Sequence, residues 1–203
     1  MMESVRSRFA VYLIPPYRIA RDVAEIHRML HKQFGFVAAG RFQVHATLKG
    51  FFKKTPGPIT PLVTQLDTFF AAQAPFPVEI HGLRCDEIGV GLNVSQLGDA
   101  PNLELLACRE RVVKAVRPFI ASDCDFVAAD LGQPFEAHLT LAFRDIPPVM
   151  QAEVLAYLRD APIPLTGTFT ADTFHLLEFF SERWTGHWEQ DLTWRLLKSW
   201  SLC

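Results

Sequence analysis

The sequence predicts an α+β fold built on antiparallel sheets, with two packed lobes in a single unit that spans residues 1–203. Three observations support this fold class. Segments with helical and with strand periodicity alternate irregularly, without the regular strand–helix–strand rhythm of a parallel α/β sheet. No glycine-rich dinucleotide-binding fingerprint follows a predicted strand. No polar or low-complexity linker divides the chain, so the two halves are expected to pack against each other.

The first part of the chain alternates strand and helix patterns. Residues 8–16 are rich in β-branched and aromatic side chains and end in a proline pair, which predicts a strand followed by a turn. Apolar residues recur at helical spacing over 18–34 and stop at Gly35, which predicts an amphipathic helix. Residues 40–53 have a strand pattern, and the Pro/Gly-rich residues 55–61 predict a loop. A second helix is expected after it, bearing Leu62, Leu66, Phe69 and Phe70.

The rest of the chain continues this mixture. Residues 75–96 contain short alternating runs separated by glycines, which predict strands joined by turns. Asp99 is the expected N-cap of a helix that starts near Pro101 and ends before Pro118. Residues 146–162, flanked by prolines, predict another helix. Strands are expected in the last two segments, 165–180 and 188–202.

Composition and charge exclude several classes of protein. Hydrophobic residues make up 49% and charged residues 21% of the chain, which is ordinary globular composition. No apolar run reaches the ~18–20 residues of a membrane helix, and residues 1–16 lack a signal-peptide layout, so a cytoplasmic location is expected. The four cysteines form no C-x-x-C pair, so neither a zinc knuckle nor a redox motif is indicated. A net charge of −2 disfavours salt-driven binding along a long nucleic-acid duplex.

One seven-residue pattern occurs twice. Residues 42–48 read FQVHATL and residues 135–141 read FEAHLTL, so Phe, His, Thr and Leu recur at the same offsets. The two histidines, His45 and His138, are 93 positions apart (138 minus 45). A single H-x-T element arises by chance in many proteins, whereas two strand-like copies about half a chain apart indicate a shared role.

Strand geometry gives this repeat a physical meaning. Side chains alternate between the two faces of a strand, so His45 and Thr47 share one face while their apolar neighbours pack on the other. His138 and Thr140 repeat this arrangement. A duplicated strand element favours pseudo-twofold symmetry, which would let the two His-Thr faces meet at one cleft.

Two imidazoles at one centre suit in-line displacement at phosphorus. A neutral imidazole can take the proton from the attacking oxygen while an imidazolium gives a proton to the leaving oxygen, because a pKa near 6.5 makes both forms accessible. The two threonine hydroxyls can donate hydrogen bonds to the non-bridging phosphate oxygens. This chemistry needs no metal and no cofactor. Which histidine acts as the base is left open by the sequence.

The two elements H-A-T-L at 45–48 and H-L-T-L at 138–141 resemble the signature of the two-histidine (2H) phosphoesterase superfamily, which includes 2′-5′ RNA ligase-like proteins and cyclic phosphodiesterases. The resemblance implies a bilobal fold in which two pseudo-twofold-related antiparallel sheets with flanking helices surround a central cleft, one motif on each lobe. It also implies a metal-independent phosphodiesterase that acts on 2′,3′-cyclic phosphates or 2′-5′ linkages of nucleotides or RNA ends. By position, the catalytic residues are His45, Thr47, His138 and Thr140.

Three further residues are candidates for substrate binding. Lys49 follows the first motif and could contact phosphate, whereas its counterpart in the second motif is Ala142. Phe51 and Phe143 could stack on a base. The expected partner is a small cyclic nucleotide or an RNA end, bound by a monomer, with no membrane and no long duplex involved.

Two other functions are compatible with the sequence. A non-catalytic module could bind an RNA end or a nucleotide in the same cleft. A metal-dependent hydrolase could use His27 and His31, which lie four residues apart on one helix, although Arg28 stands where a zinc protease motif has Glu. A solvated helix face is the simpler explanation for that histidine pair.

Overall fold

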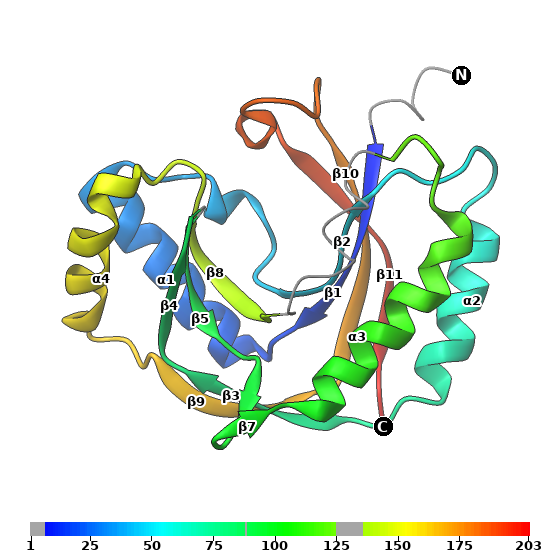
Figure 1. The fold of residues 1–203 in the computed structure, drawn as a ribbon, viewed down its shortest axis with the longest axis horizontal. Helices are drawn as coiled ribbons and strands as arrows, with labels where there is room; N and C mark the ends of the chain where they lie inside the picture. The colour runs from blue at the N-terminus through cyan, green and yellow to red at the C-terminus, as the bar shows by residue number, and fades with distance from the viewer. Residues whose placement is uncertain (1–6, 88, 125–135) are drawn as a thin grey trace.

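The computed structural model describes residues 7–87, 89–124 and 136–203 (Figure 1). The helices are α1 (Tyr17–Phe34), α2 (Thr60–Ala71), α3 (Leu103–Val116) and α4 (Gln151–Arg159). The strands are β1 (Ser7–Ile14), β2 (Ala46–Phe52), β3 (Phe76–His81), β4 (Leu83–Asp86), β5 (Gly89–Asn93), β6 (Gln96–Leu97), β7 (Ala100–Pro101), β8 (His138–Phe143), β9 (Thr166–Ala171), β10 (Thr173–Phe180) and β11 (Thr193–Ser201). In these ranges no helix has both the length and the apolar character that crossing a bilayer requires.

Seven strands form one antiparallel sheet in the order β11-β10-β1-β2-β8-β5-β4. Its two halves meet at the centre, where β2 and β8 share a single registered pair, Ala46 and Leu139. β3 and β9 pair in a separate two-stranded sheet, and β6 and β7 form a short hairpin. The predicted α+β class with antiparallel pairing is therefore confirmed.

Each half of the large sheet has its own pair of helices. Figure 1 shows α2 and α3 beside the half that contains β11, β10, β1 and β2, and α1 and α4 beside the half that contains β8, β5 and β4. The β3–β9 ribbon runs across the bottom of the view between these two groups. A pair of helices on each side of the β2–β8 junction is the arrangement that a duplicated strand motif favours.

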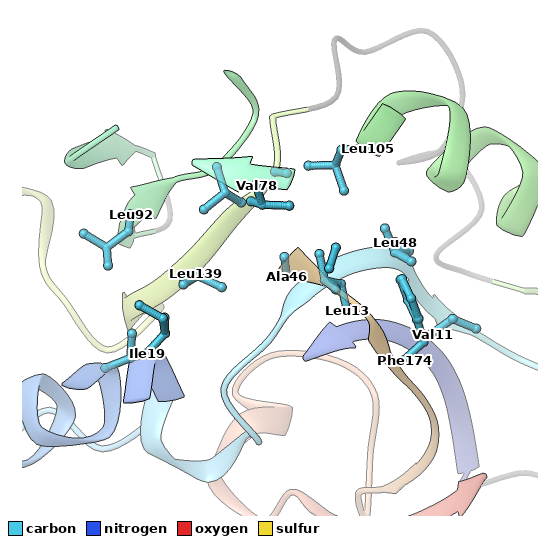
Figure 2. Packing of buried hydrophobic residues seen from close by; sticks show 14 of the residues in the cluster. Val11, Leu13, Ile19, Ala46, Leu48, Val78, Leu92, Leu105, Leu139 and Phe174 are labelled. Atoms are coloured by element: carbon cyan, nitrogen blue, oxygen red, sulfur yellow. The ribbon is translucent and has the colours of Figure 1, made fainter. Parts of the chain in front are cut away.

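The core lies on the face of the sheet that turns away from the motif histidines. Ala46 and Leu139, at the junction, are fully buried, and Val11, Leu13 and Phe174 pack beside them (Figure 2). Because neighbouring side chains on a strand point to opposite faces, burying Ala46 and Leu139 directs the residues on either side of them to the other face.

A second apolar cluster covers part of that other face. It contains Tyr12 of β1 and Phe179 of β10 together with Trp184 and Trp188, which come from the segment after β10. Every residue of β1 is consequently buried, since both faces of this strand are covered. The C-terminal tryptophans thus close one side of the space in front of the motifs.

The predicted elements are present with shifted ends, and one capping prediction is wrong. Asn102, not Asp99, is the N-cap of α3, because its side chain accepts a hydrogen bond from the Leu105 backbone N–H at 3.1 Å. Asp99 lies in the turn between β6 and β7, a hairpin that moves the start of the helix to Leu103. Phe135, the first residue of the second repeat, lies outside the described residues.

Candidate active site

The junction of β2 and β8 places the two H-x-T elements side by side. An antiparallel strand pair has a local twofold axis, and an axis at the Ala46–Leu139 pair relates each residue of β2 to the residue 93 positions later in β8. That offset equals the spacing of the sequence repeat. The register therefore relates His45 to His138 and sets each histidine opposite the threonine of the other strand.

A cavity of about 450 Å³ opens in front of this junction. Both histidines and both threonines of the motifs line it: His45, Thr47, His138 and Thr140. Phe51 and Phe143, the two predicted base-stacking residues, line it as well. The structure thus brings together six of the seven residues that the sequence singles out.

The ring of His45 is held from two sides. Its Nδ1 lies 2.6 Å from the Gln43 carbonyl oxygen, which can only accept, so the proton of the neutral ring is on Nδ1 and the lone pair is on Nε2. The ring stacks on Tyr12, with centroids 3.5 Å apart and planes 13° from parallel. The pKa of His45 is lowered to about 4, chiefly by burial and also by charge repulsion from the nearby His138.

His138 has the same backbone contact in different surroundings. Its Nδ1 donates to the Glu136 carbonyl at 2.9 Å, again two residues upstream. Arg84 binds the carboxylates of Asp86 (2.9 Å) and Glu136 (2.8 Å) close by. Burial lowers the pKa of His138; Arg84 also lowers it, whereas Asp86 and Glu136 act in the opposite direction. The two half-sites therefore share geometry but differ in their charged neighbours.

Gly91 of β5 makes room for the His138 ring. A Cβ atom at this position would lie 3.4 Å from Cδ2 of His138 and 2.9 Å from the Leu139 carbonyl oxygen. The second distance is shorter than real Cβ contacts allow, so a side chain at position 91 would displace β8. The ring of His138 thus lies over bare backbone, whereas His45 lies over an aromatic ring.

A third imidazole reaches the same cavity. His27 of α1 lines it, and its Nε2 donates to the Thr140 carbonyl at 2.9 Å. Thr140 lies on β8 next to the registered Ala46–Leu139 pair, so this hydrogen bond ties α1 to the junction of the two motif strands. Burial lowers the pKa of His27 and so favours its neutral form. His27 thus fixes the backbone that carries one of the motif threonines.

Lys49 does not line this cavity. Its side chain is fully buried; its Nζ donates to the Gly50 carbonyl at 3.0 Å and lies 5.4 Å from the Phe52 ring centroid. The pairing of β1 with β2 shifts register on both sides of Lys49. The first shift turns Lys49 away from the face of Thr47, and the second returns Phe51 to it, since each extra residue reverses the alternation.

The other histidine of the predicted helix pair lies apart from this site. His31 is exposed and does not line the cavity, whereas its neighbour His27 does. In the described part of the chain, no group of three or more His, Cys, Asp or Glu side chains is arranged to hold a metal ion. The helix spacing of His27 and His31 therefore does not correspond to a metal cluster among these residues.

A family model described as the 2′-5′ RNA ligase superfamily matches residues 15–180. The chain belongs to this superfamily. No curated protein sequence matches this chain. Solved structures with the same fold include TT0787 of Thermus thermophilus (17% identity, TM-score 0.63, covering 96% of this chain and 97% of that one) and E. coli LigT in its apo form (17%, 0.55, 97% and 98%). E. coli LigT complexed with 3′-AMP is 15% identical with a TM-score of 0.52, covering 97% and 98%. Membership of the 2′-5′ RNA ligase superfamily supports a phosphodiesterase-type activity.

Several cavity residues of this superfamily member were not singled out by sequence reasoning. Gln43 and Arg144 lie beside the motifs in the sequence, whereas the others come from elements far from them: Tyr12, Arg109 and Trp188. Arg144 has a positive φ of 61°, unusual for a residue other than glycine, and its Nη2 donates to the Gly186 carbonyl at 3.0 Å. The backbone angle is not visible in the sequence, so no pattern could have identified Arg144.

The Gln43 side chain is held by a histidine on β10. His175 Nδ1 lies 2.9 Å from Gln43 Oε1, which accepts the hydrogen bond. The carbonyl of the same Gln43 accepts from His45. A chain of two hydrogen bonds therefore runs from β10 to the first motif, and it has no described equivalent at His138, where Glu136 binds Arg84 instead.

Three partly buried imidazoles make the stability of the fold depend on pH. Burial lowers the pKa values of His27, His45 and His138, so between 6.5 and those lower values the unfolded chain binds more protons than the folded one. The free energy of unfolding is expected to fall as the pH decreases through this window. For His45 alone, a shift from 6.5 to about 4 corresponds to at most roughly 3 kcal/mol.

Urea denaturation at pH 7.5, 5.5 and 4.5 measures this effect. His45→Gln is expected to flatten the decline relative to the native sequence, and His31→Gln to leave it unchanged because His31 is exposed. Equal slopes for the native protein and His45→Gln would show that His45 titrates alike in the folded and unfolded chains.

Proposed function

We propose that this protein is a metal-independent phosphodiesterase that hydrolyses 2′,3′-cyclic phosphates or 2′-5′ linkages of nucleotides or RNA ends. One observation carries the proposal: the imidazoles and hydroxyls of both H-x-T elements line one cavity, with each Nδ1 bound to the carbonyl two residues upstream. This binding leaves the Nε2 atom of each ring available for proton transfer.

His45 is proposed as the general base and His138 as the general acid. His45 lies between the Tyr12 ring and a neutral carbonyl, surroundings that favour the uncharged imidazole. Burial and Arg84 lower the pKa of His138, but the carboxylates of Asp86 and Glu136 act in the opposite direction, so the imidazolium is less disfavoured at His138 than at His45. In hydrolysis, His45 Nε2 takes a proton from the attacking water as its oxygen bonds to phosphorus. The P–O bond to the leaving oxygen breaks, and His138 Nε2 donates the proton that makes this oxygen a free hydroxyl.

The hydroxyls of Thr47 and Thr140 are proposed to donate to the non-bridging phosphate oxygens, whose charge is redistributed in the transition state. Phe51 and Phe143 are proposed to contact the base. A cavity of about 450 Å³ suits a nucleotide or the end of an RNA chain, not a duplex. Solved structures of E. coli LigT with 3′-AMP and with ATP show small nucleotides bound to a protein of similar fold. Action as a monomer in the cytoplasm, expected from the sequence, is part of this proposal, as is one lobe on each side of the β2–β8 junction.

Turnover of a defined panel tests the proposal. The native protein is assayed with the four 2′,3′-cyclic mononucleotides and with a 2′-5′-linked dinucleotide, each with and without EDTA, and the products are identified. We expect hydrolysis of at least one substrate class at a rate that EDTA does not change. Binding without turnover would identify the non-catalytic module instead, and a rate that requires added metal would overturn the two-histidine mechanism.

A further inference from the structure

A second cavity adjoins the proposed active site. It has a volume of about 360 Å³ and lies between the C-terminal half of α1 and residues 36–41. His27 and Ala39 line both cavities, so the two share a wall. The second cavity is therefore the neighbouring site for a ligand that extends beyond the catalytic cavity on this side.

All charged side chains that line this second cavity are basic. Arg28 and Arg41 lie at its edge together with His31, whereas no Asp or Glu is among its described lining residues. Its apolar lining includes Leu30 and Phe36, both buried. In a chain with a net charge of −2, such a local excess of cations indicates an anionic ligand. Apolar walls with a few cationic groups suit the sugar or base and the phosphate of a nucleotide.

The wall formed by residues 36–41 is held in place from two sides. The backbone N–H groups of Val37 and Ala38 donate to Asp145 Oδ2 at 2.6 and 2.8 Å, which ties this segment to the end of β8. The Arg41 carbonyl accepts a hydrogen bond from Trp194 Nε1 at 2.9 Å, which ties it to β11. The backbone that carries Arg41 is therefore ordered before any ligand binds.

Both arginines can reach a ligand. Arg28 binds Glu25 in an exposed ion pair on α1, and such pairs contribute little, so a phosphate can compete for this guanidinium. Arg41 is exposed, and its guanidinium forms no hydrogen bond or ion pair with another described residue. A bidentate contact to phosphate oxygens is the interaction for which guanidinium groups are best suited.

We propose that this second cavity binds the phosphate of a nucleotide next to the one at the catalytic centre, with Arg28 and Arg41 as its ligands. Its effect on catalysis rests on the proposed function, whereas the binding of phosphate by Arg28 and Arg41 does not. The phosphate can belong to the neighbouring nucleotide of the same RNA chain or to a separate nucleotide. The first source makes the site a determinant of preference for oligonucleotides over mononucleotides.

Kinetics with two substrates test this site. The double variant Arg28→Gln/Arg41→Gln is compared with the native protein on 2′,3′-cyclic AMP and on a short RNA that ends in a 2′,3′-cyclic phosphate. We expect kcat/KM to fall about tenfold for the RNA, with a salt dependence shallower by about 1–2 in log–log slope, and to stay within about twofold for the mononucleotide. Equal losses on both substrates, or none, would overturn the proposal.

Arg21→Gln is the matched control. Arg21 lies on the same helix, is similarly exposed and is paired with Asp22, but it lines neither cavity. We expect this variant to behave as the native protein on both substrates. A loss equal to that of the double variant would show that general charge, not the second cavity, is responsible.

Binding measurements separate this site from the proposed reaction. If no substrate is turned over, fluorescence anisotropy of a labelled RNA with a 3′-phosphate, with AMP and inorganic phosphate as competitors, still reports on the site. Weaker RNA binding in Arg28→Gln/Arg41→Gln supports the site. Competition by AMP that depends on the two arginines identifies a separate nucleotide as the source, and its absence identifies the RNA chain. RNA binding that is unchanged in the double variant would refute the proposal.

Discussion

Replacing His45 or His138 by Ala is expected to lower kcat for hydrolysis of a 2′,3′-cyclic nucleotide by about 10²–10⁴-fold, the usual contribution of general acid–base catalysis. Each variant removes one Nε2 atom that the proposed mechanism needs for proton transfer. His81→Ala is the control, since His81 belongs to the separate β3–β9 sheet and lines neither cavity. The rates are measured at saturating substrate over a range of pH.

The double variant adds a sharper condition. If the two imidazoles act in one concerted step, His45→Ala/His138→Ala is expected to lose little more activity than the worse single variant, because one missing proton carrier already disables the step. Independent, multiplicative losses would mean that the two histidines contribute separately. Full activity in either single variant would remove that histidine from the mechanism.

Thr47→Val and Thr140→Val are expected to lower kcat by about 10²–10³-fold each with a smaller change in KM, because a hydrogen bond that strengthens in the transition state is lost. Valine retains the shape of threonine without its hydroxyl, so the cavity is preserved. Thr64→Val, on the exposed side of α2, is the control. A rise in KM with unchanged kcat would instead assign the hydroxyls to ground-state binding.

The repeat in the sequence predicted that the two H-x-T elements meet at one cavity, because this depends only on alternation along a strand and on the symmetry of the repeat. Alternation along a strand places His45 and Thr47 on one face whatever the tertiary structure. The 93-residue offset between the two copies equals the offset between the paired residues Ala46 and Leu139 of β2 and β8, so the repeat also indicated which residues meet. The class of fold followed from the same periodicities.

Other features depend on contacts that no local pattern carries. Lys49 was a candidate for contact with phosphate, but register shifts in β2 bury it, and such bulges have no clear signal in the sequence. Tyr12 and His27 reach the site from β1 and α1, so their roles appear only once those elements are packed. Asn102 caps α3 because the β6–β7 hairpin extends the preceding turn past Asp99.

The pH dependence of kcat/KM tests the assignment of the two histidines most directly. The base must be neutral and the acid protonated, so the rate is expected to fall below about 4, where His45 takes up a proton, and above the pKa of His138, which burial holds below 6.5. The pH profile of kcat is expected to lie at higher pH than that of kcat/KM, since bound phosphate stabilises an imidazolium and so raises the pKa values of both histidines. The account predicts that His45→Ala loses the acidic limb and His138→Ala the alkaline limb. Both limbs persisting in either variant, or a flat profile in the native protein, would contradict it.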